Sequence, residues 1–282
     1  MVNPLSFLSL AYRGHLLVED PRTYEYFSAL FVNETSQIQV VPVGGSDGVQ
    51  GLVNASWQRD ARSPIHAFGW TDRDFGLDNI AKWSDRNNHL FRGTFHEIEN
   101  YLLDWDALSG CELAMRYGKG DVDYRAECHK IANGMLYEVI CDHVLYNLRA
   151  EYCNGFPSDP SSSKQSVCSR ADVENYLINN NWLQGRSNTV GILFSESELK
   201  TRIDVAETLY TDALSSTNDD WVKIFPGKEI FEQLRCKVYT GKREKGGCVV
   251  DNDLVKSIAS YQNLHGVPNE LSMFMAELKR RI

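Results

Sequence analysis

The sequence predicts an α/β fold in which helices cover a parallel sheet, followed by a mostly helical C-terminal region. Residues 15–19, 38–43 and 65–70 are short and mostly apolar, as buried strands are. Helical patterns separate these stretches, and the order strand, helix, strand, helix, strand is typical of right-handed crossovers in a parallel sheet. Residues 89–92 are expected to add a fourth strand.

Local signals predict the two intervening helices. Pro21 suits the first turn of a helix, because its fixed φ is helical and its missing N–H is not needed there. Apolar residues follow it at helical spacing, namely Tyr24, Phe27, Leu30 and Phe31. The second helix has an apolar face made by Val49, Leu52, Val53 and Trp57.

The chain changes character after about residue 96, and we expect an α/β core in residues 1–106, followed by a helical region in residues 107–282 that supplies partner or dimer contacts. Residues 158–163 and 241–247 have the composition of loops, and a short strand is expected near residues 189–194. Apolar repeats predict further helices, with Ile131, Met135 and Val139 in one, Leu254, Ile258 and Tyr261 in another, and Leu271, Phe274, Met275 and Leu278 in the last.

Composition limits the function classes. The chain has 282 residues, and its seven cysteines include no CxxC pair, which favours reduced thiols in a cytoplasmic protein. No apolar run is long enough to span a membrane or form a signal peptide. The net charge of −9 disfavours broad phosphate binding, but it suits a protein that gathers cations or docks on a basic partner.

Three carboxylates stand at predicted strand ends. Glu19 closes the first strand, and Asp72 and Asp74 close the third. Ligands of parallel α/β sheets bind outside the carboxyl ends of the strands, so these residues can converge although they lie far apart in the sequence. If the third strand continues through Asp74, its two aspartates point to the same side; a turn at Arg73 would loosen this arrangement.

Such a cluster has a clear chemical use. Neighbouring carboxylates repel one another unless a cation is present, and Mg²⁺ or Mn²⁺ takes oxygen ligands of this kind. A bound divalent ion can contact a phosphate and activate water for attack. The alternative is ordinary structure, because a DxD sequence is often a capped turn and a strand-terminal Glu is a weak signal.

Two later residues are further candidates. Glu99 precedes an apolar helical run and could hold a second metal, or it could simply interact with the helix dipole. Lys228 follows Gly227 at a predicted helix start, where it could hold a phosphate oxygen or remain a solvated lysine. The histidines and cysteines lack zinc-ligand spacing, and no Walker A or GxSxG sequence is present.

The order of three motifs resembles that of Toprim domains, which occur in topoisomerases, primases and overcoming-lysogenization-defect nucleases. Those domains carry Glu after the first strand, glycine after the second and DxD after the third. The matching segments here are Leu16-Leu17-Val18-Glu19, Val43-Gly44-Gly45 and Thr71-Asp72-Arg73-Asp74. The resemblance covers residues 12–106, and it departs from the usual pattern at Asp20, where Toprim sequences have glycine. Asp20 could add a carboxylate or cap the helix that begins at Pro21.

Two later motifs are similar to those of a Toprim-like bacterial family often encoded beside an ABC-type ATPase. They are Glu99-Asn100-Tyr101-Leu102-Leu103 and Pro226-Gly227-Lys228. The best-known members of this family are the effector nucleases of the PARIS anti-phage system. The resemblance implies a toxic nuclease that an ABC-type ATPase holds inactive until a phage product is sensed, after which it cleaves host nucleic acid, in the PARIS effectors tRNA.

The roles that this implies can be assigned to individual residues. Asp72 and Asp74 would hold Mg²⁺, Glu19 would act as general base or metal ligand, Glu99 would hold a second metal, and Lys228 would offset phosphate charge in the transition state. One alternative is a degenerate Toprim module that only docks on the ATPase. A phosphatase of the haloacid-dehalogenase type or a DxD glycosyltransferase would leave Glu19 unexplained.

Overall fold

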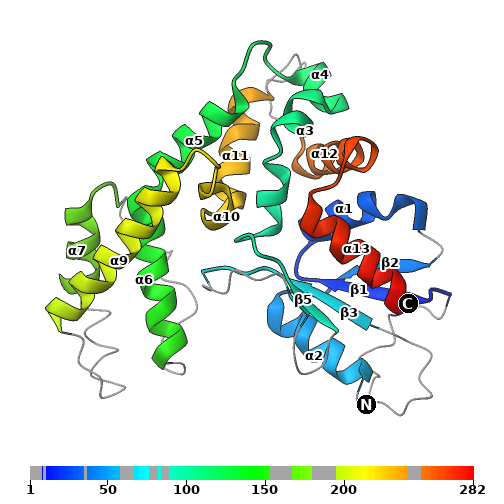
Figure 1. The fold of residues 1–282 in the computed structure, drawn as a ribbon, viewed down its shortest axis with the longest axis horizontal. Coiled ribbons are helices and arrows are strands. Elements are labelled where there is room, and N and C mark those ends of the chain that lie inside the picture. Colours follow the sequence, from blue (N-terminus) through cyan, green and yellow to red (C-terminus); the bar gives the residue numbers. More distant parts are fainter. Residues whose placement is uncertain are drawn as a thin grey trace. The chain divides into compact units, whose positions relative to one another are not determined.

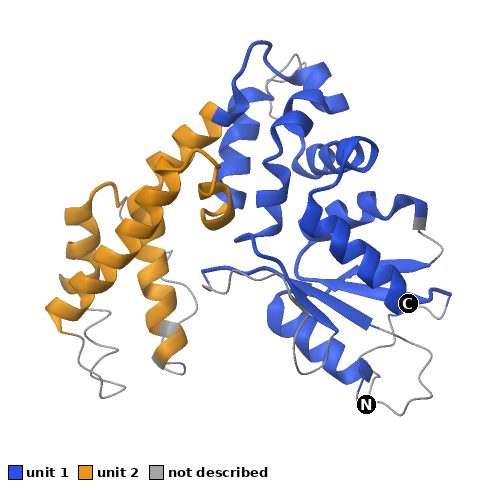
Figure 2. Cartoon of the chain, viewed as in Figure 1, with its two compact units in different colours: residues 1–125, 227–282 blue, residues 126–226 orange. Residues whose placement is uncertain are grey.

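The computed structural model describes residues 8, 11–34, 37–57, 67–75, 82–83, 89–152, 167–179, 195–239 and 249–282. The chain forms two compact units (Figure 2). The first combines residues 1–125 with residues 227–282, and the second comprises residues 126–226. The boundary expected at residue 106 therefore falls inside the first unit, which continues to residue 125. The last 56 residues of the chain, 227–282, also belong to this sheet-bearing unit.

The first unit is built on a mixed sheet whose strand order is β2-β1-β3-β5-β4. The first four of these strands are parallel, and the short β4 pairs antiparallel with β5 at the edge. The predicted parallel α/β sheet is thus confirmed, while β4 was not predicted. The strands are β1 (Gly14–Val18), β2 (Ile38–Pro42), β3 (Ala67–Thr71), β4 (Lys82–Trp83) and β5 (Leu90–Arg92).

Helices cover both faces of the sheet (Figure 1). Helix α2 (Ser46–Trp57) packs on one face, where Val49 and Val53 join Leu17 and Ala67 in a buried apolar cluster. Helices α1 (Pro21–Leu30) and α13 (Asn269–Arg281) cover the other face. These contacts bury both sides of β1 and β3, as their largely apolar sequences predicted.

An aromatic cluster fills the α1/α13 side of the sheet. Trp70 of β3 lies with its ring centroid 5.1 Å from that of Phe27 in α1 and 4.9 Å from that of Phe274 in α13. All three side chains are almost completely buried. The C-terminal helix is therefore part of the core of the sheet-bearing unit.

Other short helices complete the first unit. They include the 3₁₀ helices η1 (Val32–Glu34) and η2 (Ile98–Leu102) and the helices α3 (Trp105–Gly110), α4 (Glu112–Tyr117), α11 (Gly227–Val238) and α12 (Asp251–His265). Gln262 of α12 is fully buried and joins α12 to α1 and η2. Its Oε1 accepts a hydrogen bond of 2.6 Å from the Tyr26 hydroxyl, and its Nε2 donates one of 2.9 Å to the Tyr101 carbonyl.

The described part of the second unit is helical. Helix α5 (Tyr124–Gly134) runs across the boundary between the units, and α6 (Leu136–Tyr152), α7 (Arg170–Asn179), α9 (Glu196–Ser215) and α10 (Trp221–Ile224) follow. The helix predicted through Met135 is interrupted there, because the Met135 N–H donates to the carbonyls of both Ile131 and Ala132 in a tight turn. The loops expected at residues 158–163 and 241–247 and the strand expected at 189–194 lie outside the described residues.

None of the helices in the described ranges has the length and apolar character needed to cross a bilayer.

One arginine joins α1 to three other elements of the first unit. The Arg22 guanidinium donates hydrogen bonds to Glu99 of η2 at 2.5 Å, Glu232 of α11 at 2.5 Å and Asp251 of α12 at 2.7 Å. Its side chain is 12% exposed. A guanidinium fixed by three carboxylates in this way connects residue 22 to segments that follow more than 200 residues later.

Replacing Arg22 by alanine is expected to destabilise the first unit by about 3–5 kcal/mol, because it leaves the buried Glu99 carboxylate without its counter-charge. Arg170→Ala is the matched control. Arg170 also binds three carboxylates, those of Glu174, Asp204 and Glu207, but its side chain is 38% exposed, so we expect a loss below about 1 kcal/mol. Urea unfolding of both variants measures the difference, and equal losses would contradict it.

Candidate acidic site at the sheet edge

A glycine turn fixes the backbone of Glu19. The N–H groups of Gly44 and Gly45 each donate a hydrogen bond of 2.9 Å to the Glu19 carbonyl. Both glycines have positive φ, +87° and +95°, which side chains other than glycine rarely tolerate. The glycine pair that follows β2 in the sequence therefore holds the residue that follows β1.

The Glu19 side chain reaches the end of β3. Its Oε1 accepts a hydrogen bond of 3.0 Å from the Asp72 N–H. This contact is possible because β1 and β3 are parallel neighbours, so their carboxyl ends lie at the same edge of the sheet. The structure thus brings Glu19 next to Asp72, as the sequence predicted.

The Asp72-Arg73-Asp74 segment does not continue the strand. Strand β3 ends at Thr71, and Asp74 adopts a left-handed conformation with φ of +51°. The Asp74 N–H donates a hydrogen bond of 2.9 Å to the His96 carbonyl. The side chain of Arg73, the residue between the two aspartates, is buried. Of the two arrangements considered, the structure supports the looser one, because the strand ends before Asp72 and the His96 carbonyl stabilises a turn at Asp74.

The carboxylates at this edge interact electrostatically. Burial, followed by repulsion from Asp74 and Asp20, raises the pKa of Glu19 to about 7, although the Asp72 N–H and Arg92 oppose the change. Burial, Glu99 and Glu19 raise the pKa of Asp72 well above its ordinary value. Desolvation also raises the pKa of the more exposed Asp74. These groups are close enough for each to influence whether its neighbours are ionised.

Asp20 is a helix cap. Its Oδ1 accepts a hydrogen bond of 2.8 Å from the Thr23 N–H at the start of α1. Its φ of −140° is ordinary extended backbone, so this position does not need the glycine usual in Toprim sequences. Of the two roles considered for Asp20, the structure supports capping.

Glu99 is present at the site but is already engaged. It is 3% exposed, and Arg22 contacts its Oε1. Its negative charge is one of the causes that raise the pKa of Asp72, which places it near the cluster. Its expected role as a second metal ligand stays a prediction, and it requires the carboxylate to serve Arg22 and a cation together.

Glu97 is a member of the cluster that the sequence analysis did not assign. Its Oε2 accepts a hydrogen bond of 2.9 Å from the Lys228 N–H, and burial with repulsion from Glu99 and Glu229 raises its pKa to about 8. The Glu97 N–H in turn donates a hydrogen bond of 2.8 Å to the Asn100 Oδ1. Glu97 and Asn100 have the spacing of a capping box before an apolar run. This sequence pattern could have identified Glu97.

The Gly227-Lys228 segment meets the cluster through its backbone. Lys228 contacts Glu97 by its N–H, while its side chain is exposed. Gly227 is pressed against η2, because a Cβ added there would lie only 2.5 Å from the Asn100 nitrogen. The start of α11 is therefore close to the acidic residues, as proposed for Lys228, but the structure shows no contact from the ammonium group within the described residues.

The loop between β5 and η2 is held by α13. Glu270 Oε1 accepts hydrogen bonds from the Thr94 N–H at 2.8 Å and from the Tyr101 hydroxyl at 2.6 Å. This contact sets the path of the segment that carries His96 and Glu97 beside the end of β3. Arg92, the last residue of β5, was also missed by the sequence analysis, and its positive charge opposes the raised pKa values of Glu19 and Asp74.

The donor chemistry suits a hard divalent cation. Glu19, Asp72 and Asp74 offer only oxygen ligands, and their raised pKa values reflect desolvation and repulsion that a cation would relieve. Within the described ranges, however, no three His, Cys, Asp or Glu side chains are already arranged as a metal site. Side-chain rotation is therefore needed before these oxygens can share one ion.

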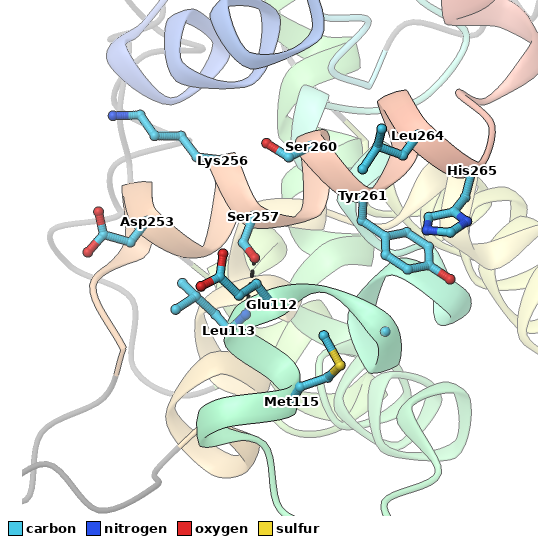
Figure 3. A pocket seen from close by; sticks show the side chains of 11 residues that line it. Glu112, Leu113, Met115, Asp253, Lys256, Ser257, Ser260, Tyr261, Leu264 and His265 are labelled. Carbon is cyan, nitrogen blue, oxygen red and sulfur yellow. Dashed lines mark hydrogen bonds between the residues drawn. The ribbon is translucent and has the colours of Figure 1, made fainter.

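A separate groove lies between α4 and α12 (Figure 3). Its volume is about 520 Å³, and Leu264 and Met115 are exposed along it. Two of the charged groups beside it are already paired, Lys256 with Glu25 at 2.9 Å and Glu112 with Arg116 at 2.8 Å. The groove contains none of the acidic-site residues and gathers no comparable set of perturbed acids, so the sheet edge is the stronger candidate site.

No known protein-family model matches the chain, and comparison with curated proteins finds no significant relative.

Gly227→Ala is expected to destabilise the first unit by about 1–3 kcal/mol, because the added methyl group would push α11 away from Asn100. Gly51→Ala is the matched control. Gly51 lies in α2 with nothing within 4 Å of an added Cβ, so alanine there should leave stability unchanged or raise it by up to about 1 kcal/mol. Thermal unfolding compares the two, and a neutral Gly227→Ala would show that α11 does not pack on η2.

Stability is expected to fall as pH rises from about 4.5 to 8. The folded-state pKa values of Glu19 and Glu97 are raised from 4.5 to about 7 and about 8, so the folded protein binds more protons than the unfolded chain in this window. Each carboxylate should contribute a decrease on the order of 2 kcal/mol in the free energy of unfolding.

Urea unfolding at several pH values, without divalent cations, measures this slope. Glu19→Gln should flatten it over the acidic part of the window, since the amide does not ionise. Glu112→Gln, on the exposed surface of α4, should keep the wild-type slope. A Glu19→Gln protein with an unchanged slope would show that Glu19 ionises normally.

Proposed function

We propose that the chain is a Toprim-type, metal-dependent nuclease that cleaves phosphodiester bonds at the edge of its parallel sheet. The observation that carries this proposal is the hydrogen bond from the Asp72 N–H to the Glu19 carboxylate, which joins the ends of β1 and β3. Around this contact, Asp74, Glu97 and Glu99 form a partly buried set of carboxylates with raised pKa values. Ordinary capped turns do not need such a set, whereas phosphodiester hydrolysis with a divalent ion does.

In this proposal Glu19, Asp72 and Asp74 hold Mg²⁺ or Mn²⁺. The bound ion supplies Lewis acidity toward the phosphate and lowers the pKa of water. Glu19 would orient the attacking water and receive its proton. Glu99 supports a second ion while remaining bound to Arg22, and the Lys228 ammonium neutralises phosphate charge as it develops.

The biological role proposed is that of a toxic effector in anti-phage defence. It rests on the order of the motifs around Glu19, Gly44-Gly45 and Asp72, together with the later motifs at Glu99 and Lys228. The geometry around these residues supports their grouping, since the glycine pair holds Glu19 and the Lys228 N–H reaches the cluster through Glu97. An ABC-type ATPase would restrain the protein, a homodimer would be its assembly, and host tRNA would be its substrate.

A second function is favoured by one observation. Arg22 already neutralises Glu99, and the remaining acids are not arranged as a ready metal site in the described residues. A protein that had lost catalysis could keep this arrangement for stability and use the fold only to dock on the ATPase. Cation binding separates the two functions, because a docking module has no need for it.

Purified protein is expected to cleave total tRNA in the presence of Mg²⁺ and to be inactive in EDTA, with plasmid DNA as the competing substrate. Glu19→Gln should lower the cleavage rate by about 10²–10⁴-fold, because the amide cannot accept a proton. Glu112→Gln should cleave like the wild-type protein, since that residue is exposed on α4 and paired with Arg116.

Calorimetric titration with Mn²⁺ completes the test. Binding to the wild-type protein that is weakened in Asp72→Asn supports the nuclease. Absence of both cleavage and cation binding would favour the docking module. Cleavage at the wild-type rate by a folded Glu19→Gln protein would remove Glu19 from the mechanism.

A further inference from the structure

The position of Arg92 suggests a binding role at the acidic edge. Arg92 ends β5 and lies in parallel register with Thr71, the residue that precedes Asp72. Its side chain is exposed, so the guanidinium is accessible to a ligand that approaches this edge. We propose that Arg92 binds a phosphate oxygen of the nucleic-acid backbone beside Glu19 and Asp74, which extends the proposed nuclease function and rests on it.

The other arginines near this edge are not available for such a contact. Arg22 is saturated by three carboxylates and is only 12% exposed. Arg73 is buried, with 5% of its surface exposed. Among these three arginines, Arg92 is therefore the one that can turn toward a ligand from solvent.

The negative charge at this edge explains why a positively charged side chain is needed to bind phosphate there. A phosphate that approaches Glu19, Asp72 and Asp74 meets a concentration of negative charge on a chain whose net charge is −9. The charge of Arg92 reaches both Glu19 and Asp74, because it lowers the pKa of each against the effect of burial. A residue that acts on both carboxylates lies where the backbone of a bound strand would pass.

The guanidinium also lacks a structural partner in the described part of the chain. No hydrogen bond or ion pair joins its side chain to another residue of the ranges described, unlike Arg22, Arg170, Arg202 and Arg235. Arginine suits phosphate better than lysine because its planar fork donates two parallel hydrogen bonds to adjacent oxygens. An exposed guanidinium beside this acidic edge is thus placed for binding, and no hydrogen bond or ion pair within the described ranges ties it to the fold.

The test compares Arg92→Ala and Arg92→Lys with wild type, and uses Arg116→Ala as the matched control. Arg116 is an exposed arginine of α4, far from β5 in the sequence and paired with Glu112. Binding of fluorescently labelled tRNA is measured in EDTA over a series of salt concentrations, and cleavage is measured with Mg²⁺. Melting temperatures verify that all variants remain folded.

Arg92→Ala is expected to weaken tRNA binding about 5–10-fold and to reduce the slope of log K against log salt by about 0.7–0.9, the effect of one lost phosphate contact. Arg92→Lys should retain the salt slope, because the charge remains, but recover only part of the affinity. Arg116→Ala should match wild type in both measurements.

The outcomes separate this inference from the proposed function. Wild-type protein that cleaves tRNA, with Arg92→Ala equal to it in binding, salt slope and cleavage, would overturn the role of Arg92 alone. Binding that depends on Arg92 in a protein without nuclease activity would overturn the nuclease and retain the phosphate contact. Wild-type protein that neither binds nor cleaves nucleic acid would overturn both.

Discussion

The Arg22 guanidinium is the contact on which the arrangement of the first unit depends. It lies at the start of α1, next to the acidic edge, and it binds carboxylates from η2, α11 and α12. Two of these elements follow the second unit in the sequence, so this one side chain helps to join the beginning and the end of the chain into a single compact body. Because Arg22 and Glu99 are largely removed from water, the geometry is specific and the loss of the arginine is costly.

The acidic edge combines rigid backbone with unfavourable electrostatics. Two glycine N–H groups hold the Glu19 carbonyl, a third N–H holds its carboxylate, and the Lys228 N–H holds Glu97. Desolvation nevertheless raises the pKa values of both side chains. The fold therefore keeps several acids in place that would separate in water, and such stored repulsion is common where a protein binds cations or transfers protons.

Much of the sheet could be predicted from local sequence, because aliphatic runs and helical spacing report burial directly. The meeting of Glu19 with Asp72 followed from the topology, since parallel neighbours end at one edge. The left-handed turn at Asp74 could not be predicted, because it depends on the carbonyl of His96 from a distant segment. The pairing of Glu99 with Arg22 and the contact of Glu97 with Lys228 could not be predicted either, because each joins residues that only the folded chain brings together.

The second unit is inserted between two parts of the first, and the place where the chain returns has a mechanical consequence. Pro226 is the last residue of the insertion, and Gly227 is the first residue of the sheet-bearing unit. The next N–H along the chain, that of Lys228, is the one bonded to Glu97. The backbone that leaves the insertion is therefore anchored to a carboxylate of the acidic edge within two residues of its return.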